Sequence, residues 1–337
     1  MKRLKTMWRV APLIAIMSLL LSGCGSPQLS ALMPRGSVAS EQLFLIELSI
    51  GIMGLVIVVV AALYFIAIIR FRKRKGQTGY PKQVEGSHKL EIIWTVIPII
   101  LLIILAVPTV YYTFLHSSDL RKDPNAVQVK VTAHQYWWEF EYPELGIHTA
   151  QDLVIPQGKK VALEIESVDV THSFWVPSLG GKLDANRGLV NTYYLETDEI
   201  DTFLGKCTEL CGASHSLMDF KVISKSTADF DAWVDGMKKP VTVAADAQKG
   251  KDLFDANCLS CHAVDVNTGS FGPNLNNIAN RTKVAGILEH TDENLKEWIK
   301  DPNELKVGNK MPAFKDMLQD NEIDEIVKYL NSLNNFK

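Results

Sequence analysis

The sequence predicts a multidomain membrane protein with a hairpin of two membrane-spanning helices, then an all-β sandwich, then an all-α domain. Two apolar runs lie near the N-terminus, segments of strand-like alternation fill the middle, and helical patterns surround a C-x-x-C-H motif near the C-terminus. With 337 residues, of which 47% are hydrophobic, the chain is long enough for two or three units. Its formal charge of −3 is close to neutral, so no nucleic-acid partner is expected.

The N-terminus has the layout of a secretory signal. Residues 1–23 have a basic start, a short apolar run and small residues before Cys24, and the run is too short for a lasting span. The ending LSGC resembles a bacterial lipobox, in which the cysteine is lipidated and becomes the mature N-terminus. We therefore expect a lipoprotein signal peptide at 1–23 and a lipid on Cys24; an uncleaved anchor with a chance cysteine is the alternative.

Residues 24–117 are predicted to form an N-terminal segment and a transmembrane hairpin. The apolar runs at about 43–69 and 92–115 each exceed the roughly 20 residues needed to cross a bilayer, a length that buried core helices rarely reach. The segment between them is rich in Arg and Lys, so it faces the cytoplasm and the rest of the mature chain faces outward. Pro98 inside the second run indicates packing against other membrane subunits, which re-satisfy the freed backbone. Glu91 opens this run, where a functional carboxylate and an ordinary interfacial one are equally consistent.

The C-terminal part carries the motif CLSCH, from Cys258 through Cys261 to His262. C-x-x-C-H attaches a c-type haem through its two thiols, while its histidine binds the iron. A thioredoxin-like dithiol fits poorly because no βαβ pattern surrounds the motif. Met311, which precedes a proline, is the predicted second iron ligand, and Met317 is its rival.

The helices around this motif resemble those of the cytochrome c family, as does the sequence GPNL at 272–275. The resemblance extends along residues 247–337 and implies an all-α class I cytochrome c domain, preceded by a linker at 237–246. One face of the last predicted helix is apolar, with Ile323, Ile326, Val327, Leu330 and Leu333.

The stretch KCTELCGASHSLM, residues 206–218, contains two cysteines, a histidine and a methionine. A disulfide between Cys207 and Cys211 would close a very short loop and give little stabilisation. Thiolate, thioether and imidazole together favour copper over zinc, and two thiolates can bridge two copper ions. His172 follows a strand-like run in a region that predicts a small antiparallel sandwich or barrel, so it is the best candidate for a second histidine. Taken singly, His172 and Met218 would more often be ordinary core or surface residues.

Together these motifs resemble subunit II of the haem–copper cytochrome c oxidases, in the bacterial caa-type form with a fused C-terminal cytochrome c domain. The pattern C-x-E-x-C-G-x-x-H-x-x-M and the sequence LEIIWTVIP in the second apolar run carry the resemblance over essentially the whole mature chain. It implies a cupredoxin-like domain at 118–236 that holds a dinuclear copper centre, CuA. The implied copper ligands are His172, Cys207, the backbone carbonyl of Glu209, Cys211, His215 and Met218.

The resemblance also implies roles near subunit I. The side chain of Glu209, helped by Asp184, would reach a magnesium ion at the boundary with that subunit. Glu91 would lie at the mouth of a proton-uptake channel of subunit I.

The family receives electrons through an aromatic run that usually begins with tryptophan. Here the run is HQYWWEFEY, so Tyr136 occupies the leading place, ahead of Trp137 and Trp138. Electron input and plain apolar packing are about equally consistent with this cluster.

The function implied is that of the electron-input subunit of a terminal respiratory oxidase in the bacterial plasma membrane, with the copper and haem domains on the outer face. Reduced cytochrome c or an upstream quinol–cytochrome c reductase would supply electrons to haem c. These would pass through CuA to subunit I, which holds haem a and copper and reduces dioxygen to water while protons are translocated. Subunit III and membrane lipid are the other expected partners.

Three alternatives remain at this point. A quinol oxidase subunit II would share the hairpin and sandwich but lack the copper motif and the haem. A stand-alone electron-transfer lipoprotein would leave Pro98 and Glu91 unexplained. A CuA subunit of a nitrogen-oxide reductase would differ in the electron acceptor of the complex.

Overall fold

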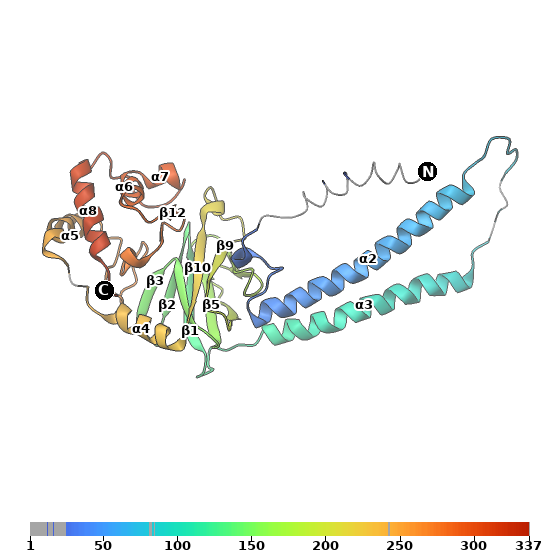
Figure 1. Ribbon diagram of the computed structural model, residues 1–337, viewed down its shortest axis with the longest axis horizontal. Coiled ribbons are helices and arrows are strands. Elements are labelled where there is room, and N and C mark those ends of the chain that lie inside the picture. Colours follow the sequence, from blue (N-terminus) through green and yellow to red (C-terminus); the bar gives the residue numbers. More distant parts are fainter. Residues whose placement is uncertain are drawn as a thin grey trace.

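The computed structural model describes Pro12, Ile16 and residues 25–80, 83, 85–241 and 243–336. The expected lipid site, Cys24, and nearly all of the expected signal peptide lie outside the described residues. The described chain forms a long helical hairpin, a β-sandwich and a helical domain, with the sandwich in the middle (Figure 1). This order confirms the predicted fold class.

Helices α2 (Ser37–Phe71) and α3 (His88–His116) form the hairpin. Both are long and apolar enough to cross a membrane, and none of the residues in their most apolar windows is buried against protein. Such an all-round apolar surface is typical of a helix that contacts lipid or other membrane helices. Pro98 lies inside α3, which continues through it. Where the hairpin meets the sandwich, Nε2 of His116 lies 2.5 Å from a carboxylate oxygen of Glu41.

The segment before α2 packs along the sandwich. Its described residues 25–36 include the 3₁₀ turn η1 (Pro27–Leu29). The hydroxyl of Ser178 donates to the carbonyl of Gln28 over 3.1 Å, and Arg35 pairs with Glu199 at 2.7 Å. These contacts tie the start of the hairpin to the domain that follows it.

Two five-stranded sheets form the sandwich. The strand order of the first is β3 (Ile147–Ala150), β2 (Trp137–Tyr142), β1 (Val127–His134), β5 (Val161–Ser167) and β8 (Asn191–Leu195). The order of the second is β4 (Asp152–Pro156), β10 (Asp219–Lys225), β9 (Thr202–Cys207), β6 (His172–Trp175) and β7 (Leu183–Ala185). Alternate side chains point inward, as on β10, and the inward faces of both sheets share one core. Helix α4 (Thr227–Lys238) follows β10 and packs against this core.

The expectation of an antiparallel sandwich or barrel was wrong for two strand pairs. Strand β1 pairs with β5 in parallel, and β10 pairs with β4 in parallel. Parallel neighbours cannot be joined by a tight turn, so the chain between them must cross over. Between β1 and β5 the chain passes through β2 and β3 and then enters the other sheet at β4. Alternation along each strand does not reveal such a crossover, because it reports only which face is buried.

The C-terminal domain is built from helices α5 (Gln248–Asn257), α6 (Asp292–Lys300), α7 (Pro302–Leu305) and α8 (Asp320–Ser332), with one short strand pair, β11 (Lys283–Val284) and β12 (Leu288–Glu289). Two 3₁₀ turns, η3 (Ala245–Ala247) and η4 (Ile278–Asn280), complete it. The predicted apolar face of α8 is buried, which confirms that prediction. Helices α5 and α8 touch at Gly250, where a Cβ atom would lie 1.9 Å from the carbonyl oxygen of Glu325.

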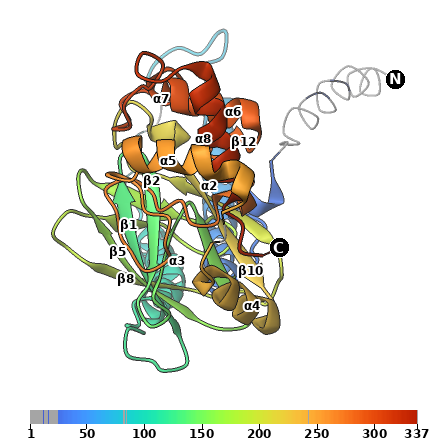
Figure 2. The same ribbon diagram turned by 90° about the vertical axis from the view of Figure 1, so that its left-hand side faces the viewer.

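The helical domain lies against one end of the sandwich, where its helices sit beside the strands (Figure 2). The hydroxyl of Ser214 donates to the carbonyl of Val307 over 2.7 Å. The backbone N–H of His148 donates to the carbonyl of Val266 over 2.8 Å. The two domains therefore meet at the loops that carry the predicted ligands.

Candidate functional site

Strand pairing brings the predicted copper ligands together. Strands β6 and β9 are antiparallel neighbours with Phe174 opposite Cys207, so His172 at the start of β6 lies beside the loop that follows β9. The 3₁₀ turn η2 (His215–Leu217) then returns the chain, and Met218 leads into β10. Local turns thus bring Cys211, His215 and Met218 together, and the pairing of β6 with β9 adds His172.

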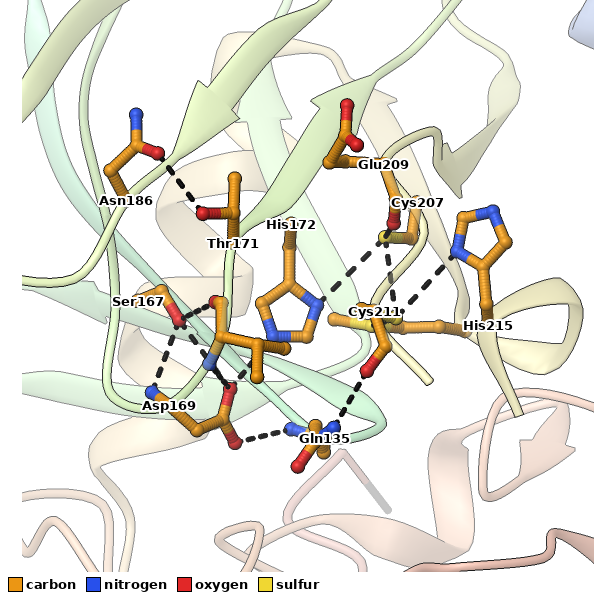
Figure 3. Close-up of polar contacts among 12 residues, drawn as sticks. Gln135, Ser167, Asp169, Thr171, His172, Asn186, Cys207, Glu209, Cys211 and His215 are labelled. Atoms are coloured by element: carbon orange, nitrogen blue, oxygen red, sulfur yellow. Dashed lines mark hydrogen bonds and ion pairs between the residues drawn. The ribbon is translucent and has the colours of Figure 1, made fainter. Parts of the chain in front are cut away.

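The two cysteine sulfurs are the centre of this cluster (Figure 3). Cys207 and Cys211 are free and buried, with their Sγ atoms 3.8 Å apart. Nδ1 of His172 lies 3.8 Å from Sγ of Cys207, and Nδ1 of His215 lies 3.6 Å from Sγ of Cys211. The ligand atoms of His172, Cys207 and Cys211 all lie within 4.8 Å of one another. Metal–sulfur bonds of about 2.3 Å allow a common metal to bind both sulfurs.

The two weaker predicted ligands lie at the same cluster. The backbone carbonyl oxygen of Glu209 is 3.3 Å from Sγ of Cys207. The thioether of Met218 is fully buried, with its Sδ 3.9 Å from Sγ of Cys211. The structure therefore brings together all six of the side-chain and backbone groups that the sequence predicted as copper ligands.

The thiols constrain what this cluster can hold. The hydrogen bond between them lowers the pKa of Cys207, whereas the same bond and burial raise the pKa of Cys211. Without added positive charge, only one of the two adjacent sulfurs ionises readily. Metal cations supply that charge, and thiolate, imidazole and thioether donors suit copper. The residues present fit a dinuclear copper centre.

Asp169 orients His172, a role that sequence reasoning missed. Its Oδ1 lies 2.8 Å from Nε2 of His172, so the other ring nitrogen faces Cys207 (Figure 3). Burial by itself would raise the pKa of Asp169, but hydrogen bonds from His172 and from the backbone of Gln135 hold it below its usual range. A carboxylate that fixes the tautomer of a ligating histidine is a common support of metal sites. Its only signal in the sequence was a position three residues before His172.

Gln135 joins this carboxylate to a cysteine and was also missed. Its backbone N–H donates to Oδ2 of Asp169 over 2.8 Å, and its amide nitrogen donates to the carbonyl of Cys211 over 2.6 Å. One residue of the aromatic run is thereby in direct contact with a predicted copper ligand.

A cavity of about 680 Å³ lies between the helical domain and the sandwich, and Cys258, Cys261, His262 and Met311 all line it. Nδ1–H of His262 donates to the carbonyl of Pro273 over 2.8 Å, which leaves Nε2 for iron. Burial lowers the pKa of His262, so the imidazole stays neutral, as a metal ligand must be. The volume and this donor set fit a covalent haem.

Both methionine candidates line the cavity, and they differ in exposure. Met311 is partly buried and packs against the core of the helical domain, and its backbone N–H donates to Asn309 over 2.8 Å. Met317 is 59% exposed. This difference favours Met311 as the iron ligand.

The sandwich supplies the opposite wall of the cavity, through residues 134–137. Tyr136 is buried, and its hydroxyl oxygen accepts a hydrogen bond of 3.1 Å from the backbone of Ala213. Ala213 lies in the loop between β9 and β10, residues 208–218, here called the cysteine loop. The ring of Trp137 stacks on His134 with centroids 4.0 Å apart. Trp138 is instead a core residue, with its ring centroid 6.1 Å from that of His172. Of the predicted aromatic cluster, two members face the cavity and the third does not.

Comparisons with known proteins agree with this architecture. Residues 34–111 match the family "Cytochrome C oxidase subunit II, transmembrane domain", residues 145–225 match "Cytochrome C oxidase subunit II, periplasmic domain", and residues 247–334 match "Cytochrome c". Cytochrome c oxidase subunit 2 of Bacillus sp. (strain PS3) is 51% identical over 97% of this chain and 97% of its own length. The chain belongs to the cytochrome c oxidase subunit II family.

Other relatives extend the comparison. Cytochrome c oxidase subunit 2 of Alkalihalophilus pseudofirmus is 47% identical, with 99% of each chain covered. A quinol oxidase subunit 2 of Bacillus cereus is 35% identical, but the match covers 68% of this chain and 80% of that protein. Subunit II is thus a membrane-anchored part of a haem–copper oxidase, with subunit I as a partner. Its domains imply CuA and haem c as cofactors.

The predicted magnesium ligands of this subunit II lie on either side of a lysine. Nζ of Lys182 is 3.5 Å from Asp184 and 3.8 Å from the side chain of Glu209, and both carboxylates are half-exposed. Asp184 also accepts a hydrogen bond of 2.8 Å from Ser173. The magnesium ion stays a prediction, since the ammonium already compensates the charge of both carboxylates.

Glu91 lies in the first turn of α3, at the end of the hairpin away from the sandwich (Figure 1). Its exposed carboxylate is 3.5 Å from Nδ1 of His88. It therefore faces outward from this chain, where another subunit could contact it.

Proposed function

We propose that this chain is the electron-input subunit of a terminal cytochrome c oxidase, which receives electrons at haem c and passes them through CuA to the haem of subunit I. One observation carries the proposal. The cavity that contains the haem-attachment motif is walled by Gln135, Tyr136 and Trp137, and Gln135 donates a hydrogen bond to Cys211. A direct series of protein contacts thus joins the two cofactor sites.

The residues have three proposed roles: some hold the haem, some hold the copper pair, and others position these ligands. Cys258 and Cys261 hold the haem covalently, and His262 with Met311 binds its iron, a pairing that raises the haem potential. Cys207, Cys211 and the other four groups of the cysteine cluster hold the copper pair. Both cofactors supply reversible one-electron chemistry when bound.

The remaining residues position these groups and exclude water. Asp169 fixes His172, and Gln135 holds the carbonyl of Cys211. Tyr136 fills the space between the cysteine loop and the haem cavity. A copper pair held by Cys207 and Cys211 would supply one-electron transfer with little change at each ligand.

We further propose how the subunit is oriented in the membrane and which partners it has. The loop between α2 and α3 contains Arg72, Lys73, Arg74 and Lys75, which favours a cytoplasmic position for it and an outer-face position for both redox domains. A lipid on Cys24, subunit III, reduced cytochrome c or a quinol–cytochrome c reductase as donor, and a role for Glu91 at a proton channel of subunit I all belong to this proposal.

The test is metal and haem analysis of the purified holoprotein, combined with electron paramagnetic resonance. We expect two coppers and one haem per chain, and a hyperfine pattern from one electron shared between equivalent copper nuclei. Activity with dioxygen, and none with nitrogen oxides, is expected of the whole complex. A copper-free protein in which Cys207 and Cys211 are oxidised to each other would overturn the proposal.

A further inference from the structure

Lys306 is a buried lysine in the wall of the haem cavity. It follows helix α7, is 2% exposed, and lines the cavity together with the haem-motif residues. Its Nζ donates to the carbonyl of Ala285 over 3.0 Å, which uses one of its three N–H donors. Within the described part of the chain, no carboxylate lies within ion-pair distance of this ammonium. A buried charge of this kind is costly unless an opposite charge pairs with it.

The electrostatic surroundings of Lys306 are suited to binding an anion. Burial lowers the pKa of Lys306 to about 8, and the more distant charge of Asp219 opposes this shift. Asp219 is the first residue of β10 and belongs to the sandwich that carries the cysteine cluster, here called the copper domain. The ammonium therefore lies between the two redox sites, in a place that an anion in the cavity would stabilise.

The position of Lys306 is determined by the contact between the domains. Ala285 and Gly286 form the turn between β11 and β12, which presses on the copper domain so closely that a Cβ on Gly286 would lie 2.9 Å from the carbonyl oxygen of Asp219. On the other side, the carbonyl of Val307 accepts the hydrogen bond from Ser214. Both neighbours of the lysine are thus held by the copper domain, so its ammonium cannot easily turn toward solvent.

A covalently attached haem brings two carboxylates of its own into this cavity. Arg281 also lines the cavity, and one of its nitrogens donates to the carbonyl of Asn274 over 2.6 Å. Lys310 lines the cavity as well, but it pairs with Asp169 at 3.5 Å, so the cavity offers Lys306 and Arg281 to the two carboxylates. We propose that Lys306 binds a haem carboxylate at the junction with the copper domain and raises the haem reduction potential there, an inference that rests on the proposed function.

The test is a redox titration of the haem in the detergent-solubilised Lys306→Met holoprotein. Methionine is unbranched like lysine and only one atom shorter, and it carries no charge. The lost positive charge favours the oxidised haem, so the equilibrium constant for reduction should fall about tenfold, as expected for one unit charge at low dielectric. The matched control is Lys328→Met on α8, where the lysine is 48% exposed and pairs with Asp246. Its haem titration should follow the wild type.

Two further measurements make the result decisive. The pyridine-haemochrome spectrum reports whether haem is attached, and a wild-type protein without haem would refute the proposed function rather than this inference. An attached haem with an unchanged potential in Lys306→Met would overturn the role of Lys306. If that variant does not take up haem, an experimental structure of the wild-type holoprotein decides: Nζ must lie within about 3.5 Å of a haem carboxylate oxygen, and a lysine turned away from the haem refutes the assignment.

Discussion

Asp169 determines which nitrogen of His172 faces the copper cluster, and this makes it the most informative residue to change. The Asp169→Asn variant keeps the size of the side chain but removes its charge and can donate where the carboxylate accepts. Because outer partners of metal ligands typically contribute 10–100-fold to metal affinity, we expect a loss of about that size in copper affinity. Competition with a copper chelator measures it.

The control for this prediction is Asp231→Asn, which removes a carboxylate from the exposed face of α4. Equal copper affinities in the two variants would show that Asp169 does not support His172.

Met218 allows a direct test of the weakest side-chain ligand. It is fully buried in the sandwich core, and leucine has a similar volume, so Met218→Leu should cost less than about 1.5 kcal/mol of stability. The thioether is lost, however, so the copper potential should shift and the two nuclei should become inequivalent in the electron paramagnetic resonance spectrum. A spectrum identical to that of the wild type would remove Met218 from the ligand set.

Among the elements, the cysteine loop and the loop after α7 form one of the contacts between the domains. The hydrogen bond from Ser214 to the carbonyl of Val307 joins them directly. Ser214→Ala should leave the copper spectrum unchanged but slow electron transfer from haem to copper several-fold, because the loops lose a buried contact of about 1 kcal/mol. Flash photolysis measures the rate, and Ser216→Ala, on the exposed side of the same turn, should match the wild type. Equal rates in both variants would contradict a role for this contact.

Strands β2 and β3 carry an ion pair that makes stability depend on pH. Nδ1 of His148 lies 3.7 Å from Glu139, which raises the pKa of His148, although burial opposes this. The pKa of Glu139 is lowered to about 2, because hydrogen bonds with His134 and His148 outweigh its burial. The stabilisation from His148 is therefore fully present below its unfolded pKa of about 6.5 and is lost as the pH rises through its higher folded value. That from Glu139 is lost only in acid, below about pH 4.

Between pH 6 and pH 9, the contribution of His148 should change and that of Glu139 should not. The melting temperature of the wild type should exceed that of His148→Gln by a few degrees at pH 6, and the difference should shrink toward pH 9. His290→Gln is the control, since Nε2 of His290 lies 3.1 Å from the uncharged amide oxygen of Asn331. A difference in melting temperature that stays constant over this pH range would contradict the assignment.

At the scale of the whole molecule, the helical domain covers residues 134–137 of the copper domain. A chain that ends at Lys238, the last residue of α4, would lack the haem domain and expose Tyr136 and Trp137. We expect its copper signal to persist in the assembled oxidase, because the predicted copper ligands contact one another within the sandwich. Turnover with a reduced soluble cytochrome should fall at least tenfold, since the haem that receives the electrons is gone. Undiminished turnover would show that electrons enter at copper instead.

The order of the domains and most of the predicted ligands can be derived from the sequence alone. The hairpin follows from the length of two apolar runs, and the haem motif and the cysteine loop are contiguous, so their chemistry is visible without a fold. The apolar face of α8 follows from helical periodicity, which is a local property.

The surroundings of these ligands depend on how the chain folds in three dimensions. Gln135 reaches Asp169 across 34 residues and Cys211 across 76, and Lys306 becomes a buried cation only because two domains close over it. The parallel pairing of β1 with β5 was equally hidden. Periodicity and motif spacing report on neighbours along the chain, whereas hydrogen bonds, burial and charge depend on neighbours in space. The contacts of Asp169 and Gln135 with the predicted copper ligands, and the burial of Lys306, depend on such neighbours in space.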